Sequence, residues 1–221
     1  QLGHKTMAVN LSDIAAMGGE PTAAFLAMGL TPDLGVQFVR DFREGLLACA
    51  RSHQVDLLGG DTVSCRRDLA LCLTLLGRAG RDEVILRSGA RPGHTVMLGG
   101  VVGDSAAGLH LVLGRPGEVD PRERSLLLEA HRMPRAQVAL GRLLATRHMV
   151  TAMIDVSDGV LQDLGHICTE SGGGAALDAD CLPVSDAARS LARAAGRDAR
   201  DWALSGGEDF VLLFCVPAGC E

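Results

Sequence analysis

The stretch Met153-Ile154-Asp155-Val156-Ser157-Asp158-Gly159 places two carboxylates three residues apart, between an apolar run and a glycine. Side chains alternate along a strand, so Asp155 and Ser157 share one face and Ile154 and Val156 share the other. Carboxylates at the end of a strand can hold a hard cation such as Mg²⁺. The structural alternative is that Ser157 or Asp158 caps the helix that follows. Carboxylates so close together repel one another unless a cation or a capping amide offsets the repulsion, and of these two we favour a cation site. The helix N-terminus beside it also attracts phosphate oxygens.

Two further segments combine a glycine pair with a carboxylate. Gly59-Gly60-Asp61-Thr62 follows a short apolar run. We predict that it forms a turn at the end of a strand, where open α/β sheets bind ligands and where glycines let backbone amides approach them. Ser205-Gly206-Gly207-Glu208-Asp209 precedes another apolar run, and its carboxylates suit a charged substrate group or a metal-bound water. An ordinary solvated turn explains either segment equally well, since glycine and aspartate are common turn residues.

A fourth acidic position lies near the start of the chain. Asn10 and Asp13 are three residues apart, so on a helix they lie on the same face, one turn from each other. We predict Asp13 as a further cation ligand, against the alternative of a solvated helix face. We predict that Asp163 is an exposed helix residue, despite its closeness to Asp155. Arg87 is a candidate phosphate contact, because a guanidinium group binds phosphate through two hydrogen bonds, and a surface linker arginine is the alternative.

The composition excludes several classes of protein. The chain has 221 residues, 47% of them hydrophobic, and a formal net charge of −6. No run of Lys and Arg resembles a nucleic-acid-binding surface, and no apolar segment of about 20 residues could span a membrane. The seven cysteines are an odd number without C-x-x-C spacing. They indicate reduced thiols in a cytoplasmic protein rather than a zinc site or a disulfide framework.

Strand and helix patterns alternate irregularly along the chain, which favours an α+β fold of mixed α/β layers. Arginines gather with Gly89 and Pro92 just beyond residue 80, so we place a domain boundary there. The N-terminal domain then covers 1–80 and the C-terminal domain covers 81–221. The strand over 69–77 is apolar on both faces, so we expect it to be well covered. Periodicity predicts helices over 4–17, 31–50, 106–113, 134–148, 158–170 and 185–195, and strands over 22–30, 55–58, 69–77, 95–98, 152–155 and 210–216.

Taken in order, these motifs resemble the thiamine-monophosphate kinase family. The matching segments keep the family's order and span nearly the whole chain. They are Lys5–Gly18, Leu58–Thr62, Arg87–Ala90, Gly103–Leu109, Met153–Gly159 and Ala203–Phe210. The resemblance implies a two-domain fold like that of aminoimidazole ribonucleotide synthetase. It also implies transfer of the γ-phosphoryl group of ATP to thiamine monophosphate, which yields thiamine diphosphate and ADP.

The resemblance further implies a role for each matching site residue. The Mg²⁺ ligands would be Asp13, Asp61, Asp155 and Asp158. The ATP contacts would be Gly60, Asp61, Arg87 and Ser157. The contact to the thiamine substrate would be Glu208. No side chain is assigned as nucleophile or base, because a substrate phosphate oxygen can attack the γ-phosphorus directly and the protein mainly positions groups and offsets charge.

The chain departs from the family's pattern at both ends. Family members carry an upstream segment with further metal ligands and a substrate-contacting histidine, and they continue past Pro217 to an aromatic residue near the thiamine. We therefore expect a fragment truncated at both ends, and a homodimer formed through the N-terminal domains in the full-length protein. Two alternatives remain open. One is a sister ATP-dependent synthetase of the same superfamily, and the other is a truncated nucleotide-binding module without activity.

Overall fold

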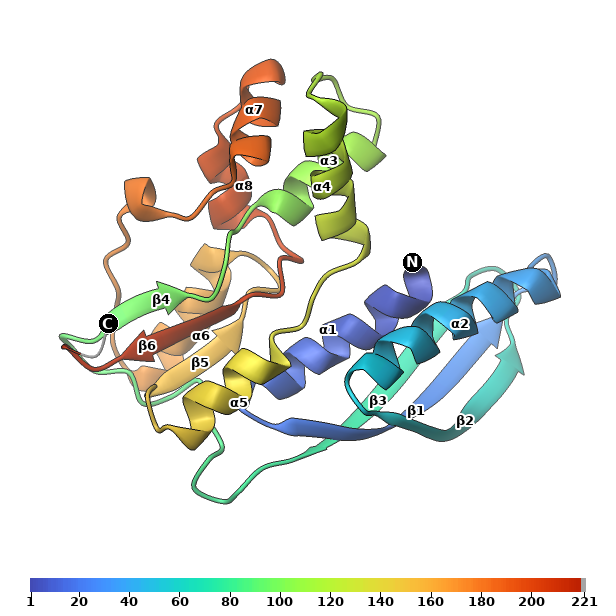
Figure 1. Ribbon diagram of the computed structural model, residues 1–221, viewed down its shortest axis with the longest axis horizontal. Coiled ribbons are helices and arrows are strands. Elements are labelled where there is room, and N and C mark those ends of the chain that lie inside the picture. Colours follow the sequence, from blue (N-terminus) through green and yellow to red (C-terminus); the bar gives the residue numbers. More distant parts are fainter. Residues whose placement is uncertain (220–221) are drawn as a thin grey trace.

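The computed structural model describes residues 1–219, which form two three-stranded sheets and the helices packed around them (Figure 1). The first sheet contains β1 (Glu20–Leu30), β2 (Asp56–Ser64) and β3 (Ala70–Arg78) in the order β2-β1-β3. Its central strand β1 is parallel to β2 and antiparallel to β3. A sheet with both parallel and antiparallel pairs, together with the helices that lie between strands along the chain, confirms the predicted α+β fold of mixed layers.

The second sheet contains β4 (Thr95–Leu98), β5 (Ala152–Asp155) and β6 (Leu212–Val216) in the order β4-β6-β5. Both outer strands are antiparallel to β6. The strand β5 is buried along its whole length and ends on Asp155, as the apolar run before the carboxylate predicts.

Two helices cover one face of the first sheet. They are α1 (Leu2–Ala16) and α2 (Val36–Ser52), and their apolar stripes meet the inward residues of β1 in a core that includes Met7, Leu11, Ala24, Phe42 and Leu46. Helix α1 also contacts β5 and α5 (Val138–Thr146), so it lies between the two sheets (Figure 1). A residue on α1 can therefore face the end of β5.

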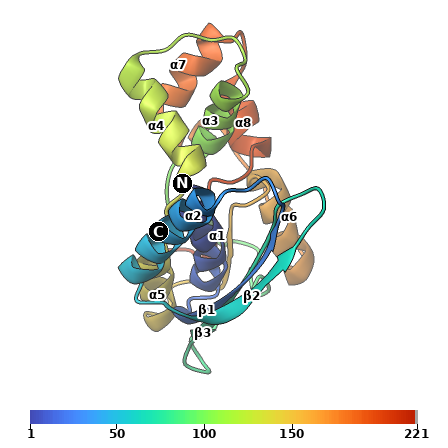
Figure 2. The same ribbon diagram turned by 90° about the vertical axis from the view of Figure 1, so that its right-hand side faces the viewer.

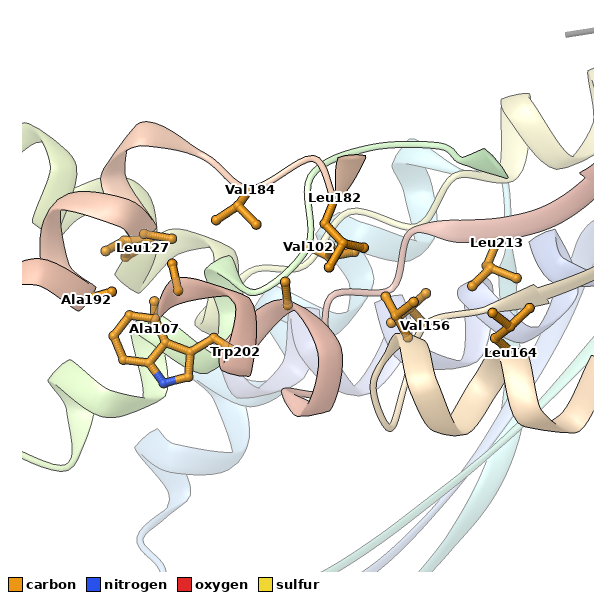
Figure 3. Packing of buried hydrophobic residues seen from close by; sticks show 14 of the residues in the cluster. Val102, Ala107, Leu127, Val156, Leu164, Leu182, Val184, Ala192, Trp202 and Leu213 are labelled. Carbon is orange, nitrogen blue, oxygen red and sulfur yellow. The ribbon is translucent and has the colours of Figure 1, made fainter. Parts of the chain in front are cut away.

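Four helices form a separate group above the sheets in Figures 1 and 2: α3 (Asp104–Val112), α4 (Pro121–Arg132), α7 (Asp186–Ala194) and α8 (Ala199–Ser205). Figure 3 shows that their core, around Trp202 and Leu127, continues to Val156, Leu164 and Leu213 beside the second sheet. Helix α6 (Val160–Ser171) covers that sheet, and a short 3₁₀ turn spans Ala179–Cys181. Continuous packing ties the helix group to the strand that carries Asp155.

Several expectations require correction. Helices α4 and α8 were not predicted, and α5 is shorter than the predicted 134–148. Strand β3 is not covered on both faces, because Cys72, Thr74 and Leu76 are exposed. Among residues 1–219 the six cysteines are free, as expected, while Cys220 lies outside the described residues. None of the described helices is long and apolar enough to cross a membrane.

The segment Gly59-Gly60-Asp61-Thr62 is not a turn at a strand end, as predicted, but lies inside β2. Gly60 has φ +151°, and a Cβ there would run into the carbonyl oxygen of Leu26 on β1. The glycine is thus required by the neighbouring strand, whatever else it contacts. The register between β1 and β2 also shifts just before it, between Ala24 and Phe25.

We expect Gly60→Ala to lower the free energy of unfolding by at least about 2 kcal/mol, because strand β1 must shift and the φ is unfavourable for alanine. Urea denaturation measures the loss. Gly59→Ala is the matched control, since the nearest atom to its added Cβ is Phe25 Cδ1 at 3.9 Å. Equal stability of the two variants would contradict this account of Gly60.

Candidate active site

Asp155 ends β5 with a buried carboxylate, 5% exposed. The hydroxyl of Ser12 on α1 donates a hydrogen bond of 2.5 Å to its Oδ2. Burial raises the pKa of Asp155, and the nearby charge of Asp158 raises it further, while the Ser12 hydrogen bond and Arg87 oppose the rise. A carboxylate held in this way costs free energy when ionised, and a cation would offset that cost.

Asp13 follows Ser12 and belongs to the same electrostatic group. Partial burial raises the pKa of Asp13, the charge of Asp155 adds to the rise, and Arg87 opposes it. Three of the four predicted metal ligands are therefore linked through Asp155, since its charge acts on Asp13 and the charge of Asp158 acts on it, while Arg87 acts on Asp13 and Asp155. Among residues 1–219 no three metal-ligating side chains already stand where they could share one ion. The arrangement is an open group of carboxylates rather than a closed cage.

Asp163 organises the loop after β5, contrary to the prediction of an exposed residue. It is 1% exposed, and its Oδ2 accepts the backbone N–H groups of Ser157, Asp158 and Gly159 at 3.0, 3.1 and 3.2 Å. Neither Ser157 nor Asp158 caps α6, which begins after Gly159. Because Asp163 occupies these three amides, they are not available to phosphate oxygens, and the expected anion site at this helix start is not formed by them.

The loop over 205–210 is bound to the loop after β5. The N–H of Glu208 donates to the carbonyl of Ser157, and the N–H of Phe210 donates to the carbonyl of Val156, each at 2.8 Å. A Cβ on Gly207 would run into the carbonyl oxygen of Ser157. Two motifs about fifty residues apart in the chain thus form one structural unit, which brings Glu208 beside Ser157.

Glu208 itself has an unusual backbone and two basic neighbours. Its φ is +67°, a region that few residues other than glycine adopt and that often marks functional sites. Lys5 Nζ lies 3.0 Å from its Oε2, and His131 Nδ1 lies 3.4 Å from the same oxygen. Sequence reasoning did not predict Lys5, His131 or the Ser12 hydrogen bond, because each contact joins segments that are far apart in the chain, by 77 residues for His131 and Glu208 and by more for the other two.

Asp209 fixes the glycine-rich turn before α3. Its carboxylate accepts the N–H groups of Gly103 and Ser105 at 2.7 and 3.2 Å, and Gly103 has φ +91°. This carboxylate therefore holds the turn between β4 and α3. Burial raises the pKa of Asp209 to about 7, although the two N–H donors oppose the rise. Asp209 thereby links the Glu208 loop to α3.

Asp209 should make stability depend on pH. Its folded-state pKa of about 7 exceeds the usual aspartate value near 4, so between these values the folded chain keeps a proton that the unfolded chain has released. The contribution of protonated Asp209 to the free energy of unfolding is complete below about pH 4 and is lost as the pH rises through about 7. The free energy of unfolding of the wild type, relative to Asp209→Asn, should fall by about 1 kcal/mol or more from about pH 5 to 7.5. Urea denaturation of both proteins across that range tests this, and parallel pH profiles would contradict it.

Two further predicted site residues, Arg87 and Asp61, are both exposed. Arg87 is exposed in the segment between the sheets, close enough to influence Asp13 and Asp155. Asp61 is exposed on β2, pairs in register with Ala27, and accepts the N–H of its neighbour Thr62. Strands β2 and β5 lie on opposite sides of α1 in Figure 1. Asp61 is not among the charges that shift the pKa of Asp13 or Asp155.

Comparison with known proteins identifies the family. The model described as "AIR synthase related protein, N-terminal domain" matches residues 1–79, and "AIR synthase related protein, C-terminal domain" matches residues 91–219. The thiamine-monophosphate kinase of Stenotrophomonas maltophilia K279a superposes with a TM-score of 0.89 at 39% identity, over 98% of this chain and 68% of that one. The chain belongs to the thiamine-monophosphate kinase family. A second structure, "AaThiL complexed with AMPPCP and TMP", has a TM-score of 0.92 at 30% identity, over 99% of this chain and 69% of that one.

The similarity extends along the chain but not along the whole of its relatives. The thiamine-monophosphate kinase of Salmonella typhimurium is 40% identical over 217 residues, which are 98% of this chain and 64% of that protein. The chain thus spans a little under two thirds of the length of that family member.

Proposed function

We propose that the chain transfers the γ-phosphoryl group of ATP to the phosphate of thiamine monophosphate, forming thiamine diphosphate and ADP in thiamine diphosphate biosynthesis. The observation that carries the proposal is the pair of 2.8 Å backbone hydrogen bonds that holds the Glu208 loop against the loop after Asp155. These bonds bring Glu208, the proposed contact to thiamine, close to the loop that carries Asp155 and Asp158, which are proposed to bind Mg²⁺. Membership of the thiamine-monophosphate kinase family and the relative complexed with AMPPCP and TMP support the proposed substrates.

The donor set fits Mg²⁺. Asp13, Asp155 and Asp158 offer only oxygen ligands. Burial and a neighbouring carboxylate raise the pKa of Asp13 and of Asp155, while Arg87 opposes the rise in both and the Ser12 hydrogen bond opposes it in Asp155. Mg²⁺ commonly binds one or two carboxylates together with substrate phosphates and water, so an open group without a closed cage suits it. We propose that these three residues hold Mg²⁺, and that Asp61 binds Mg²⁺ from strand β2, apart from this group. When bound, the metal would neutralise charge on the phosphates.

The chain's own residues would mainly position the reactants. Arg87 and Ser157 would contact ATP, together with the backbone of Gly60 and Asp61 on β2. Glu208 would hold the thiamine so that its phosphate oxygen attacks the γ-phosphorus in line. The bond between that phosphorus and the bridging oxygen then breaks, and ADP leaves. No side chain has to act as nucleophile or base, because the attacking phosphate oxygen is already ionised.

The exposed face of the first sheet supports a homodimer. Phe25, Val63 and Leu76 are 40%, 54% and 48% exposed, and Cys72 and Thr74 are exposed beside them. We propose that this face pairs with a second copy in the full-length protein. We also propose that the two sheets belong to two domains divided near residue 80, and that the protein is cytoplasmic, which is consistent with its free cysteines in the described residues.

Label transfer tests the proposed reaction. The protein is incubated with Mg²⁺, thiamine monophosphate and ATP that carries labelled phosphorus in the γ position. We expect the label in thiamine diphosphate, and none of this transfer once a chelator removes the metal. Label found only in inorganic phosphate would indicate ATP hydrolysis and favour a sister synthetase. Nucleotide binding without any label transfer would favour a module without activity.

A further inference from the structure

Lys5 is the only lysine in the chain, since the other twenty of its 21 basic residues are arginines. Arginine therefore serves wherever this chain uses a surface cation. An ammonium group differs from a guanidinium group because it is compact and directs three N–H donors tetrahedrally rather than in a planar fork.

The surroundings of Lys5 are unlike those of the chain's exposed ion pairs. Its Nζ donates to Glu208 Oε2 at 3.0 Å and to the carbonyl oxygen of His131 at 2.7 Å. The Lys5 side chain is 19% exposed, whereas that of Arg135 in the surface pair with Glu129 is 85% exposed. Exposed ion pairs contribute little to stability. A largely buried ammonium group that donates to two acceptors restricts the positions of both acceptors, here the Glu208 carboxylate and the His131 carbonyl.

His131 completes the same cluster from the end of α4. Its Nδ1 lies 3.4 Å from Glu208 Oε2 and 3.2 Å from the hydroxyl of Ser105 on α3. The histidine side chain is 14% exposed. Burial lowers the pKa of His131, and the charges of Lys5 and Arg132 lower it further, while the charge of Glu208 opposes the decrease. The cluster thus favours Lys5 over His131 as its cation.

Among residues 1–219, the contacts of the Glu208 carboxylate are all on one oxygen. Lys5 and His131 both approach Oε2, and no partner for Oε1 exists among residues 1–219. The Glu208 side chain is 44% exposed, so Oε1 remains open to a ligand. A carboxylate fixed through one oxygen keeps the other in a constant direction, which reduces the entropy lost when a substrate N–H group binds it.

Helix α1 contacts both the Glu208 cluster and the aspartates around Asp155. Lys5 and Ser12 are seven residues apart, so they lie on the same face of α1, about 10 Å apart along its axis. One contacts Glu208 and the other contacts Asp155. The helix thus sets the spacing between the end of the site that would hold the heterocycles and the end that would hold the phosphates.

We propose that Lys5 is a positioning residue for the thiamine substrate. It holds Glu208 through Oε2, with His131 beside it, so that Oε1 accepts a hydrogen bond from an N–H donor of the heterocyclic part of thiamine monophosphate. This inference rests on the proposed function. If Lys5 served only to hold α1 against α4, its replacement would lower stability but would not change KM for thiamine monophosphate more than KM for ATP.

The experiment compares five proteins: the wild type, Lys5→Met, Glu208→Gln, the double variant and His4→Ala. His4 is the matched control, because its Nε2 contacts the carbonyl of Pro134 at 2.9 Å and so joins α1 to the same segment without touching Glu208. Steady-state kinetics give KM for thiamine monophosphate and KM for ATP separately, and thermal melts check that each variant is folded.

We expect Lys5→Met to raise KM for thiamine monophosphate about 10- to 100-fold and to leave KM for ATP within about twofold. The double variant should be no worse than Glu208→Gln alone, because Lys5 acts through Glu208. His4→Ala should keep both constants near the wild type. Additive effects in the double variant, or equal changes in both KM values, would overturn the proposal.

Binding separates failure of this inference from failure of the proposed function. If the wild type binds thiamine monophosphate in equilibrium dialysis but does not turn over, the same comparison is made with Kd, and the same ratios are expected. If the wild type neither binds nor phosphorylates thiamine monophosphate, the proposed function fails and the role of Lys5 is overturned with it.

Discussion

Asp155→Asn is expected to lower kcat by about 100-fold or more and to leave the melting temperature within a few degrees of the wild type. The variant loses the negative charge that would bind Mg²⁺, while its amide oxygen can still accept the hydrogen bond from Ser12. Burial already raises the pKa of Asp155, so the ionised group contributes no stability that asparagine must replace.

The kinetic loss is measured as thiamine-monophosphate-dependent ADP formation, next to a melt of the same preparation. Ser12→Ala is the control that removes the 2.5 Å hydrogen bond and leaves the charge, and we expect it to lower kcat much less than Asp155→Asn. A kcat near the wild-type value in Asp155→Asn would contradict the assignment of this carboxylate to the metal.

Asp163→Ala is expected to produce the second large effect, on stability. Three N–H groups in a partly buried loop would lose the carboxylate that accepts them at 3.0 to 3.2 Å. Buried donors without a partner cost about 1 to 3 kcal/mol each, and neighbouring water can satisfy some of them. We therefore expect a loss of about 2 to 4 kcal/mol in the free energy of unfolding, together with lower activity because the loop carries Ser157 and Asp158.

Urea denaturation measures this loss, and Asp186→Ala provides a comparison. Asp186 lies in the first turn of α7, where Ser185 already supplies the cap by accepting the N–H of Ala188. Its replacement should cost less than about 1 kcal/mol. If Asp163→Ala were as stable as Asp186→Ala, the loop after β5 would not depend on the buried carboxylate. Asp155 and Asp163 are both buried. Replacing Asp155 is thus expected mainly to lower activity, whereas replacing Asp163 is expected mainly to lower stability.

Elements with a strong local pattern were predictable from the sequence. The strand over 152–155 was predicted at its observed bounds, because an apolar run ends there in a carboxylate. Helix α4 was missed although Asp120 accepts the N–H of Arg122 and Pro121 stands at the first helical position. Its buried side is narrow, with Leu127 as its buried residue, so the apolar periodicity that identifies helices is weak.

The candidate site was predictable only in part, because its most specific contacts are long-range. Asp13, Asp155 and Asp158 could be chosen from local acidic patterns. Nothing local indicates that Asp163 would turn inward to bind three amides, since a carboxylate in the first turn of a helix is usually solvated. The Lys5 contact to Glu208 spans 203 residues, and its local signal is the single lysine itself.

The exposed face of the first sheet was mispredicted for a different reason. An apolar pattern on both faces of a strand predicts that both are covered, but it does not say by what. In β3 the described residues cover the face that carries Leu71, Leu73 and Leu75, and they leave Cys72 and Leu76 exposed. In the proposed dimer a second copy of the chain would cover this face of β3. The hydrophobic pattern of one strand does not indicate whether its cover comes from the same chain or from another.

The measurement that tests the central claim most directly is ADP release by the purified protein with ATP and Mg²⁺, with and without thiamine monophosphate. We predict that ADP forms at a rate that depends on thiamine monophosphate and is near background without it. ADP release that is unaffected by thiamine monophosphate, or no release from a protein that binds ATP, would contradict the claim that this chain is a thiamine-monophosphate kinase in activity as well as in family.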